Sequence, residues 1–134
     1  MWITPTITIS DRDNPNWAFR AAGNVDILET SAMGDCFALI IVNPDGSRIL
    51  AHLPAGDLNQ VRGGGGLVAM NALIVAGAAV TIIRGLANLQ ETAYFMGVKY
   101  QNLLALAVPA GLAQTQAGFF AYADVSAAGV VNFW

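Results

Sequence analysis

The feature that most constrains this chain is a pair of apolar segments joined by a tight turn. Residues 37–42 are continuously apolar and rich in β-branched side chains, which is typical of a strand buried on both faces. Residues 43–46 read Asn-Pro-Asp-Gly, a strong turn signal, and residues 47–53 return as a second strand. These segments together predict a β-hairpin.

The predicted hairpin brings together the only cysteine and the only histidine of the chain. Cys36 directly precedes the first strand, and His52 lies near the end of the second. The open ends of a hairpin lie side by side, so we expect these two residues to be neighbours. A single cysteine excludes an internal disulfide, and with one histidine it makes a zinc site improbable. We therefore expect neither a metal nor a cofactor.

The rest of the chain predicts further strands and two helices. We expect an edge strand and a polar loop within residues 1–20 and a strand within 23–30, because both contain alternating apolar positions. The other predicted elements are a buried helix at 67–77, a strand at 80–83, a helix within 91–107, and a final hairpin from 118–125 and 129–134. This order favours a single α+β domain, residues 1–134, with layered, sandwich-like mixed sheets flanked by helices.

Charge and hydropathy exclude several classes of partner. Charged residues make up 11% of the chain, the net charge is -3, and the six lysines and arginines are scattered. Without a basic cluster we expect no binding to nucleic acid or to a membrane surface. The apolar run 67–83 contains Asn71 and is too short to span a bilayer. The N-terminus lacks the pattern of a secretory signal, so we expect the cytoplasm, or export by another route.

The cysteine and the histidine suggest nucleophilic catalysis. A thiol is a good nucleophile only as the thiolate, and His52 is the available base. Such a histidine needs a third group on its other ring nitrogen, and Thr30 could reach it from the preceding strand. Backbone N–H groups of Gly34, Asp35 and Cys36 could hold an oxyanion, because glycine permits unusual backbone angles. This set would support acyl transfer through a thioester.

The same residues resemble the core of the CheD chemoreceptor glutamine deamidases. In that family a threonine precedes the cysteine by the same interval as Thr30, and a glycine lies two residues before it, as Gly34 does. A histidine beside Leu-Pro follows after a strand and a turn, as His52 does. Burkholderia lethal factor and, more distantly, the cytotoxic necrotizing factors share this scaffold and triad. The resemblance covers residues 23–134, and the motifs that are specific to the family occupy a short part of this range.

The resemblance implies a protein-glutamine deamidase. Cys36 would attack the carboxamide carbon of a glutamine side chain, and His52 would act as the base and then the acid. The implied partners are a protein that presents a glutamine and a cognate regulator or inhibitor. Asp35 stands where the family has serine, and an adjacent carboxylate raises the pKa of a thiol unless it points away. The segment that chemotaxis enzymes use for partners is degraded, which favours a toxin or secreted effector.

Other functions remain open from the sequence. The thioester could be resolved by an amine in transglutamination, or the enzyme could cut a peptide bond. A chemoreceptor-type deamidase and a binding module that has lost catalysis on the same scaffold are further alternatives. The last alternative is an apolar domain that packs into a complex, with Trp2, Trp17 and Trp134 as interface anchors.

Overall fold

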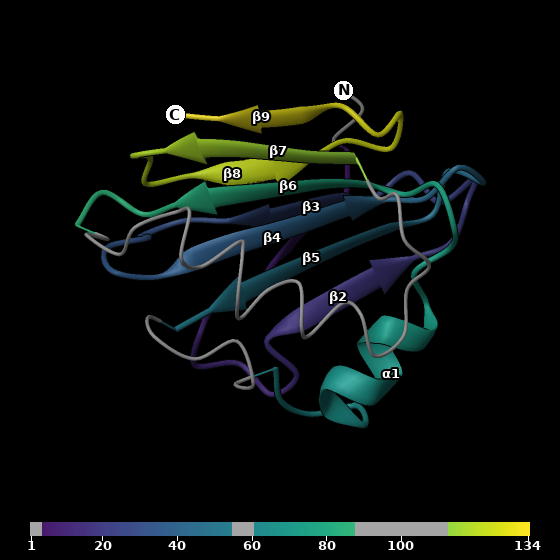
Figure 1. The fold of residues 1–134 in the computed structure, drawn as a ribbon, viewed down its shortest axis with the longest axis horizontal. Helices are drawn as coiled ribbons and strands as arrows, with labels where there is room; N and C mark the ends of the chain where they lie inside the picture. Colours follow the sequence, from purple (N-terminus) through teal and green to yellow (C-terminus); the bar gives the residue numbers. More distant parts are fainter. Residues whose placement is uncertain (1–3, 55–60, 88–112) are drawn as a thin grey trace.

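The computed structural model describes residues 4–54, 61–87 and 113–134, and two β-sheets make up most of this part of the chain (Figure 1). The four-stranded sheet has the order β1 (Thr6–Thr8), β3 (Ile27–Thr30), β8 (Ala123–Val125), β9 (Val131–Phe133). The five-stranded sheet has the order β2 (Trp17–Arg20), β5 (Arg48–Leu53), β4 (Phe37–Val42), β6 (Ala79–Arg84), β7 (Ala113–Gly118). The helix α1 (Gly66–Ala72) completes an α+β fold dominated by strands.

The central hairpin is formed by β4 and β5, as the sequence predicts. The strands pair antiparallel from Phe37 opposite Leu53 to Val42 opposite Arg48. The turn closes with a 3.0 Å hydrogen bond from the Gly46 N–H to the Asn43 carbonyl, and Gly46 has a φ of 91° that favours glycine. The hairpin register fixes which side chains share a face.

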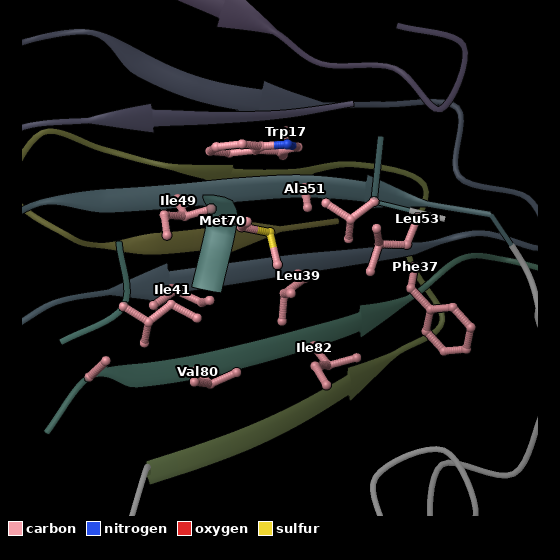
Figure 2. Packing of buried hydrophobic residues seen from close by; sticks show 13 residues of the cluster. Trp17, Phe37, Leu39, Ile41, Ile49, Ala51, Leu53, Met70, Val80 and Ile82 are labelled. Atoms are coloured by element: carbon pink, nitrogen blue, oxygen red, sulfur yellow. The ribbon is translucent and has the colours of Figure 1, made fainter. Parts of the chain in front are cut away.

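Side chains alternate along β4 and divide the core into two clusters. Phe37, Leu39 and Ile41 face one side, where Met70 of α1 and Trp17 of β2 pack over them (Figure 2). This alternation buries both faces of β4, which confirms the prediction for residues 37–42.

The second cluster lies between the two sheets. It combines residues of the four-stranded sheet with residues of the five-stranded sheet: Leu28, Ala123 and Val125 with Ala38, Ile40, Leu50 and Ile83. Arg48 is also fully buried on this side, and its guanidinium donates to the carbonyls of Asn24 (3.1 Å) and Val125 (3.4 Å). The face of β5 that carries His52 therefore looks into the space between the sheets.

The N-terminal prediction was right for the first strand and incomplete for the second. β1 forms an edge of the four-stranded sheet, as expected. The segment predicted as a polar loop also contains β2, because Trp17 is buried against the core and its strand pairs with β5. β7, which pairs parallel with β6, was not predicted either.

The first helix is shorter than predicted and partly exposed. It ends at Ala72 rather than continuing to 77, and Val68 is exposed. Asn43 explains the end, since its side chain donates to the Leu73 carbonyl and accepts the Val75 N–H. Among the described residues α1 is the one helix, so flanking by two helices is not observed there.

Two other expectations concern the C-terminal half. The final hairpin is present as β8 and β9, which pair antiparallel over fewer residues than expected. The helix predicted within 91–107 lies outside the described residues. Within the parts of the chain that are described, no helix has the length and apolar character needed to cross a membrane.

Candidate active site

Two of the predicted site residues, Thr30 and His52, meet in the space between the sheets. His52 on β5 pairs with Ala38 on β4, and paired residues of antiparallel strands share a face. Cys36 directly precedes β4, and the Nε2 atom of His52 makes no hydrogen bond to its sulfur. Thr30 is the last residue of β3, in the other sheet.

Thr30 and His52 are in direct contact across the two sheets. The Thr30 Oγ1 lies 2.5 Å from the His52 Nδ1. Both side chains are buried, with exposed fractions of 0% and 3%. This contact joins two residues that are 22 positions apart in the chain and fixes the orientation of the imidazole ring.

The carbonyl of Ile9 decides which ring nitrogen of His52 carries the proton. Thr30 Oγ1 donates to the Ile9 carbonyl at 2.7 Å, and a carbonyl can only accept. A threonine hydroxyl has one proton, so its contact with His52 is one in which Thr30 accepts and Nδ1–H donates. Neutral His52 therefore carries its proton on Nδ1 and a lone pair on Nε2. Sequence reasoning missed Ile9, because a backbone carbonyl leaves no signature in residue type.

The Nε2 atom of His52 is suited to accept a proton. It is buried and has no hydrogen-bond partner among the described residues. Burial lowers the pKa of His52 from its ordinary value, whereas the charges of Asp11 and Asp13 and the Ile9 backbone oppose that shift. Burial is the largest of these effects, so His52 is neutral at pH 7 and available as a base.

Asn16 holds the backbone of His52 from the neighbouring loop. Its carbonyl accepts the His52 N–H at 3.0 Å, and its Nδ2 donates to the His52 carbonyl at 3.2 Å. Its Oδ1 accepts the Arg62 N–H at 3.0 Å, which ties the glycine-rich segment to the same point. Asn16 is fully buried. It was missed because an asparagine in a polar stretch is indistinguishable in sequence from a surface loop residue.

The loop that carries Cys36 is held by the segment that follows β6. The N–H groups of Gly85, Leu86 and Ala87 donate to the carbonyls of Cys36 (2.9 Å), Met33 (3.0 Å) and Gly34 (2.8 Å), respectively. A Cβ atom at Gly85 would lie 2.7 Å from the Met33 carbonyl oxygen, so the two segments approach more closely than another residue would allow. This packing fixes the backbone on which Cys36 stands.

The residue with an unusual backbone conformation in this loop is not the one that we expected. We expected Gly34 to adopt unusual backbone angles, but the positive φ of 54° belongs to Ala32. Gly34 has no positive φ, and its carbonyl accepts the Ala87 N–H. Within the described residues, the N–H groups of Gly34 and Asp35 have no hydrogen-bond partner, so both could donate to an oxyanion.

Asp35 does not point away from Cys36. The Cys36 Sγ lies 3.8 Å from the Asp35 Oδ1 and donates to it. Cys36 is buried, with an exposed fraction of 7%, whereas Asp35 is exposed. The carboxylate stabilises the S–H form of the cysteine, which is the less reactive form.

Comparison with models of known protein families and with curated proteins finds no match to this chain. Among the described residues, no three acidic, histidine or cysteine side chains are grouped in a way that could hold a metal ion. The assignment of function therefore rests on the geometry around His52.

Proposed function

We propose that this chain is a cysteine amidohydrolase that converts a protein glutamine side chain into glutamate and ammonia. Cys36 is the nucleophile, His52 the general base, and Thr30 the group that orients His52. The observation that carries this proposal is the fixed tautomer of His52. An imidazole whose Nδ1–H is held by a hydroxyl, and whose Nε2 is buried without a partner, has the arrangement that a general base requires.

The reaction proceeds through a thioester. His52 Nε2 takes the proton from the Cys36 thiol, and Sγ attacks the carboxamide carbon of the glutamine. The tetrahedral oxyanion is held by the N–H groups of Gly34 and Asp35. The C–N bond then breaks, and His52 returns its proton to the departing ammonia. Water, activated by His52, hydrolyses the thioester and releases glutamate with the thiol restored.

The fold we propose is the layered sandwich of the CheD-like deamidases. Two packed sheets, with the threonine on one and the histidine on the other, support this assignment. We place the protein among bacterial toxins or secreted effectors rather than chemotaxis enzymes, because the segment that chemotaxis enzymes use for partners is degraded. A single new carboxylate in a buried interface of the target would cost several kcal/mol, which is enough to disable it.

The decisive experiment measures deamidation directly. The wild type and Cys36→Ser are incubated with a host-cell lysate, and ammonia and glutamine-to-glutamate conversions are measured by mass spectrometry. Conversions that require Cys36 would establish the activity and identify the substrate. Crosslinked or cleaved products would instead indicate transglutamination or proteolysis. A lysate unchanged by the wild type, together with a thiol that alkylates only above about pH 8, would contradict the proposal.

A non-catalytic binding module is the second candidate, and the contact between Asp35 and Cys36 favours it. The Asp35 carboxylate favours the S–H form of Cys36, which a catalytic cysteine must leave. A protein that no longer needs catalysis can keep such a carboxylate. The rate at which iodoacetamide alkylates Cys36 separates the two functions. In a binding module the thiol is inert, and it stays unreactive when Asp35 is replaced by asparagine.

A further inference from the structure

Asn16 binds two separate segments of the chain, and it uses both its backbone and its side chain for each. Its carbonyl accepts the His52 N–H at 3.0 Å, and its Nδ2 donates to the His52 carbonyl at 3.2 Å. Its N–H donates to the Arg62 carbonyl at 3.3 Å, and its Oδ1 accepts the Arg62 N–H at 3.0 Å. The side-chain amide of Asn16 therefore acts as a second peptide group between His52 and Arg62.

The residue type at position 16 follows from this double role. One side-chain atom must accept an N–H while another donates to a carbonyl, so aspartate lacks the donor and alanine lacks both groups. Glutamine carries the same amide on a longer side chain, but Asn16 is fully buried, so the added length would displace its neighbours. At a buried position an unpaired backbone group is costly, which makes these hydrogen bonds important for the two segments that they join.

The glycine-rich segment 62–66 packs closely on the loop that carries Asn16. A Cβ atom at Gly63 would clash with the Asn14 Oδ1 and would lie 2.7 Å from the Pro15 Cα. Gly63 also has a φ of 76°, which favours glycine. The segment and the loop therefore form one packed unit, and Asn16 joins this unit to the histidine.

The hydrogen bonds of Asn16 extend the pairing of β2 with β5 as far as His52. The last regular pair of these strands is Trp17 opposite Ala51, and Asn16 lies opposite the next residue of β5. The backbone of His52 is thus held on this side, whereas its Nδ1 contacts the Thr30 Oγ1 of the other sheet. The imidazole reaches Thr30 only from the place that its own backbone gives it.

We propose that Asn16 is a positioning residue for His52, through which the glycine-rich segment 62–66 keeps the imidazole in one tautomer. With the segment in place, the Nδ1–H stays on Thr30 and the lone pair stays on Nε2. When the segment moves away, the backbone of His52 shifts, the contact with Thr30 is weakened, and both tautomers are populated. The catalytic consequence rests on the proposed function: displacing the segment impairs the general base without touching its ring.

Nitrogen-15 NMR of the imidazole tests the proposal, because His52 is the only histidine of the chain. At about pH 8 the ring is neutral. The wild type should then show one resonance typical of a protonated nitrogen, from Nδ1, and one typical of an unprotonated nitrogen, from Nε2. In Asn16→Ala and in Gly63→Ala the two resonances should move towards each other, because exchange between the tautomers averages them. Resonances that stay at their wild-type positions in both variants would contradict the proposal.

Matched controls carry the same kinds of change elsewhere in the chain. Gly23→Ala introduces alanine at a φ of 84°, where a Cβ atom meets nothing within 4 Å. Asn43→Ala removes another buried asparagine whose side chain both donates and accepts, at the other end of the β4–β5 hairpin. Both controls should leave the His52 resonances unchanged even where they lower stability. Equal movement in the controls and in Asn16→Ala would indicate general loosening of the fold and would overturn the role of Asn16.

Hydrogen exchange of the wild type tests the link without any variant, and it decides the matter if the variants do not fold. The amide protons of His52 and Arg62 are both held by Asn16, so they should exchange with the same free energy of opening. An Arg62 amide that exchanges much faster than the His52 amide would show that the segment moves independently, against the proposal. None of these results decides the proposed deamidase function, which the lysate assay of the wild type tests by itself.

Discussion

At the scale of single residues, one hydroxyl proton determines what His52 can do. Thr30 gives its proton to the Ile9 carbonyl and so must accept from the imidazole. The choice of tautomer follows from this chain of two hydrogen bonds. It does not depend on any charged partner, which distinguishes this site from triads oriented by a carboxylate.

Replacing Thr30 by valine tests this chain of hydrogen bonds. Thr30→Val keeps the shape of the side chain but frees His52 to adopt either tautomer, so we expect deamidation and Cys36 alkylation at pH 7 to fall about 10²-fold. Thr30→Ser retains the hydroxyl and should keep most of both activities. Alkylation kinetics with iodoacetamide measure the effect. A serine variant as impaired as the valine variant would show that packing, and not the hydroxyl, is what matters.

Burial of His52 predicts a dependence of stability on pH. The folded protein holds the pKa of His52 below its ordinary value of 6.5, so above pH 6.5 the residue is neutral in both folded and unfolded states. As the pH falls through 6.5 towards the folded pKa, the unfolded chain gains a proton that the folded chain does not. Stability is then lost with a limiting slope of about 1.4 kcal/mol per pH unit.

Urea unfolding of the wild type and His52→Gln between about pH 5 and pH 8 measures this slope. The free energy of unfolding of the wild type should fall more steeply below pH 6.5 than that of His52→Gln. Parallel curves for the two proteins would mean that His52 titrates alike in the folded and unfolded states.

At the scale of elements, the site depends on two segments that approach closely. The loop before β4 carries Cys36, and the segment after β6 holds that loop by three backbone hydrogen bonds. Neither segment is a helix or a strand, so its conformation comes from this mutual contact. The backbone at Cys36 is therefore held by its packing against Gly85.

Gly85→Ala should disturb this contact. The added Cβ would crowd the carbonyl oxygens of Gly34 and Met33, so the two segments must separate, at a cost of about 1–3 kcal/mol in the free energy of unfolding. Gly34→Ala is the control for stability, since a Cβ there meets nothing within 4 Å and the backbone has no positive φ. Thermal unfolding compares the two. A Gly85→Ala protein as stable as Gly34→Ala would contradict the close packing.

At the scale of the whole molecule, the contact between Thr30 and His52 exists because two sheets pack face to face. Thr30 belongs to one sheet and His52 to the other, so their contact depends on how the two sheets are aligned. The cluster around Leu50 and Ile40 supplies the apolar area that holds the layers together. Stability and the alignment of the site should therefore depend on the same core.

Leu50→Ala tests this dependence. Leu50 is fully buried between the sheets, and its truncation should lower the free energy of unfolding by about 2–5 kcal/mol. Val68→Ala, on the exposed face of α1, should change it by no more than about 0.5 kcal/mol. Circular dichroism followed during urea unfolding gives both values. A small loss for Leu50→Ala would show that the interlayer core contributes little to stability.

The sequence by itself determined the elements whose signals are local. The apolar run and the Asn-Pro-Asp-Gly turn specify the β4–β5 hairpin, because strand burial and turn chemistry act over neighbouring residues. Hairpin register then follows, and with it the pairing of Ala38 with His52. The coarse α+β class could be read from the same patterns.

The tertiary structure alone decided the contacts between distant segments. The pairing of β2 with β5, the hydrogen bond from Thr30 to Ile9 and the hydrogen bonds between Asn16 and His52 join residues that lie far apart in the sequence. The end of α1 was decided in the same way, by an asparagine from the hairpin turn. Such contacts depend on which backbone groups meet after the sheets pack, and backbone groups are the same in every residue type.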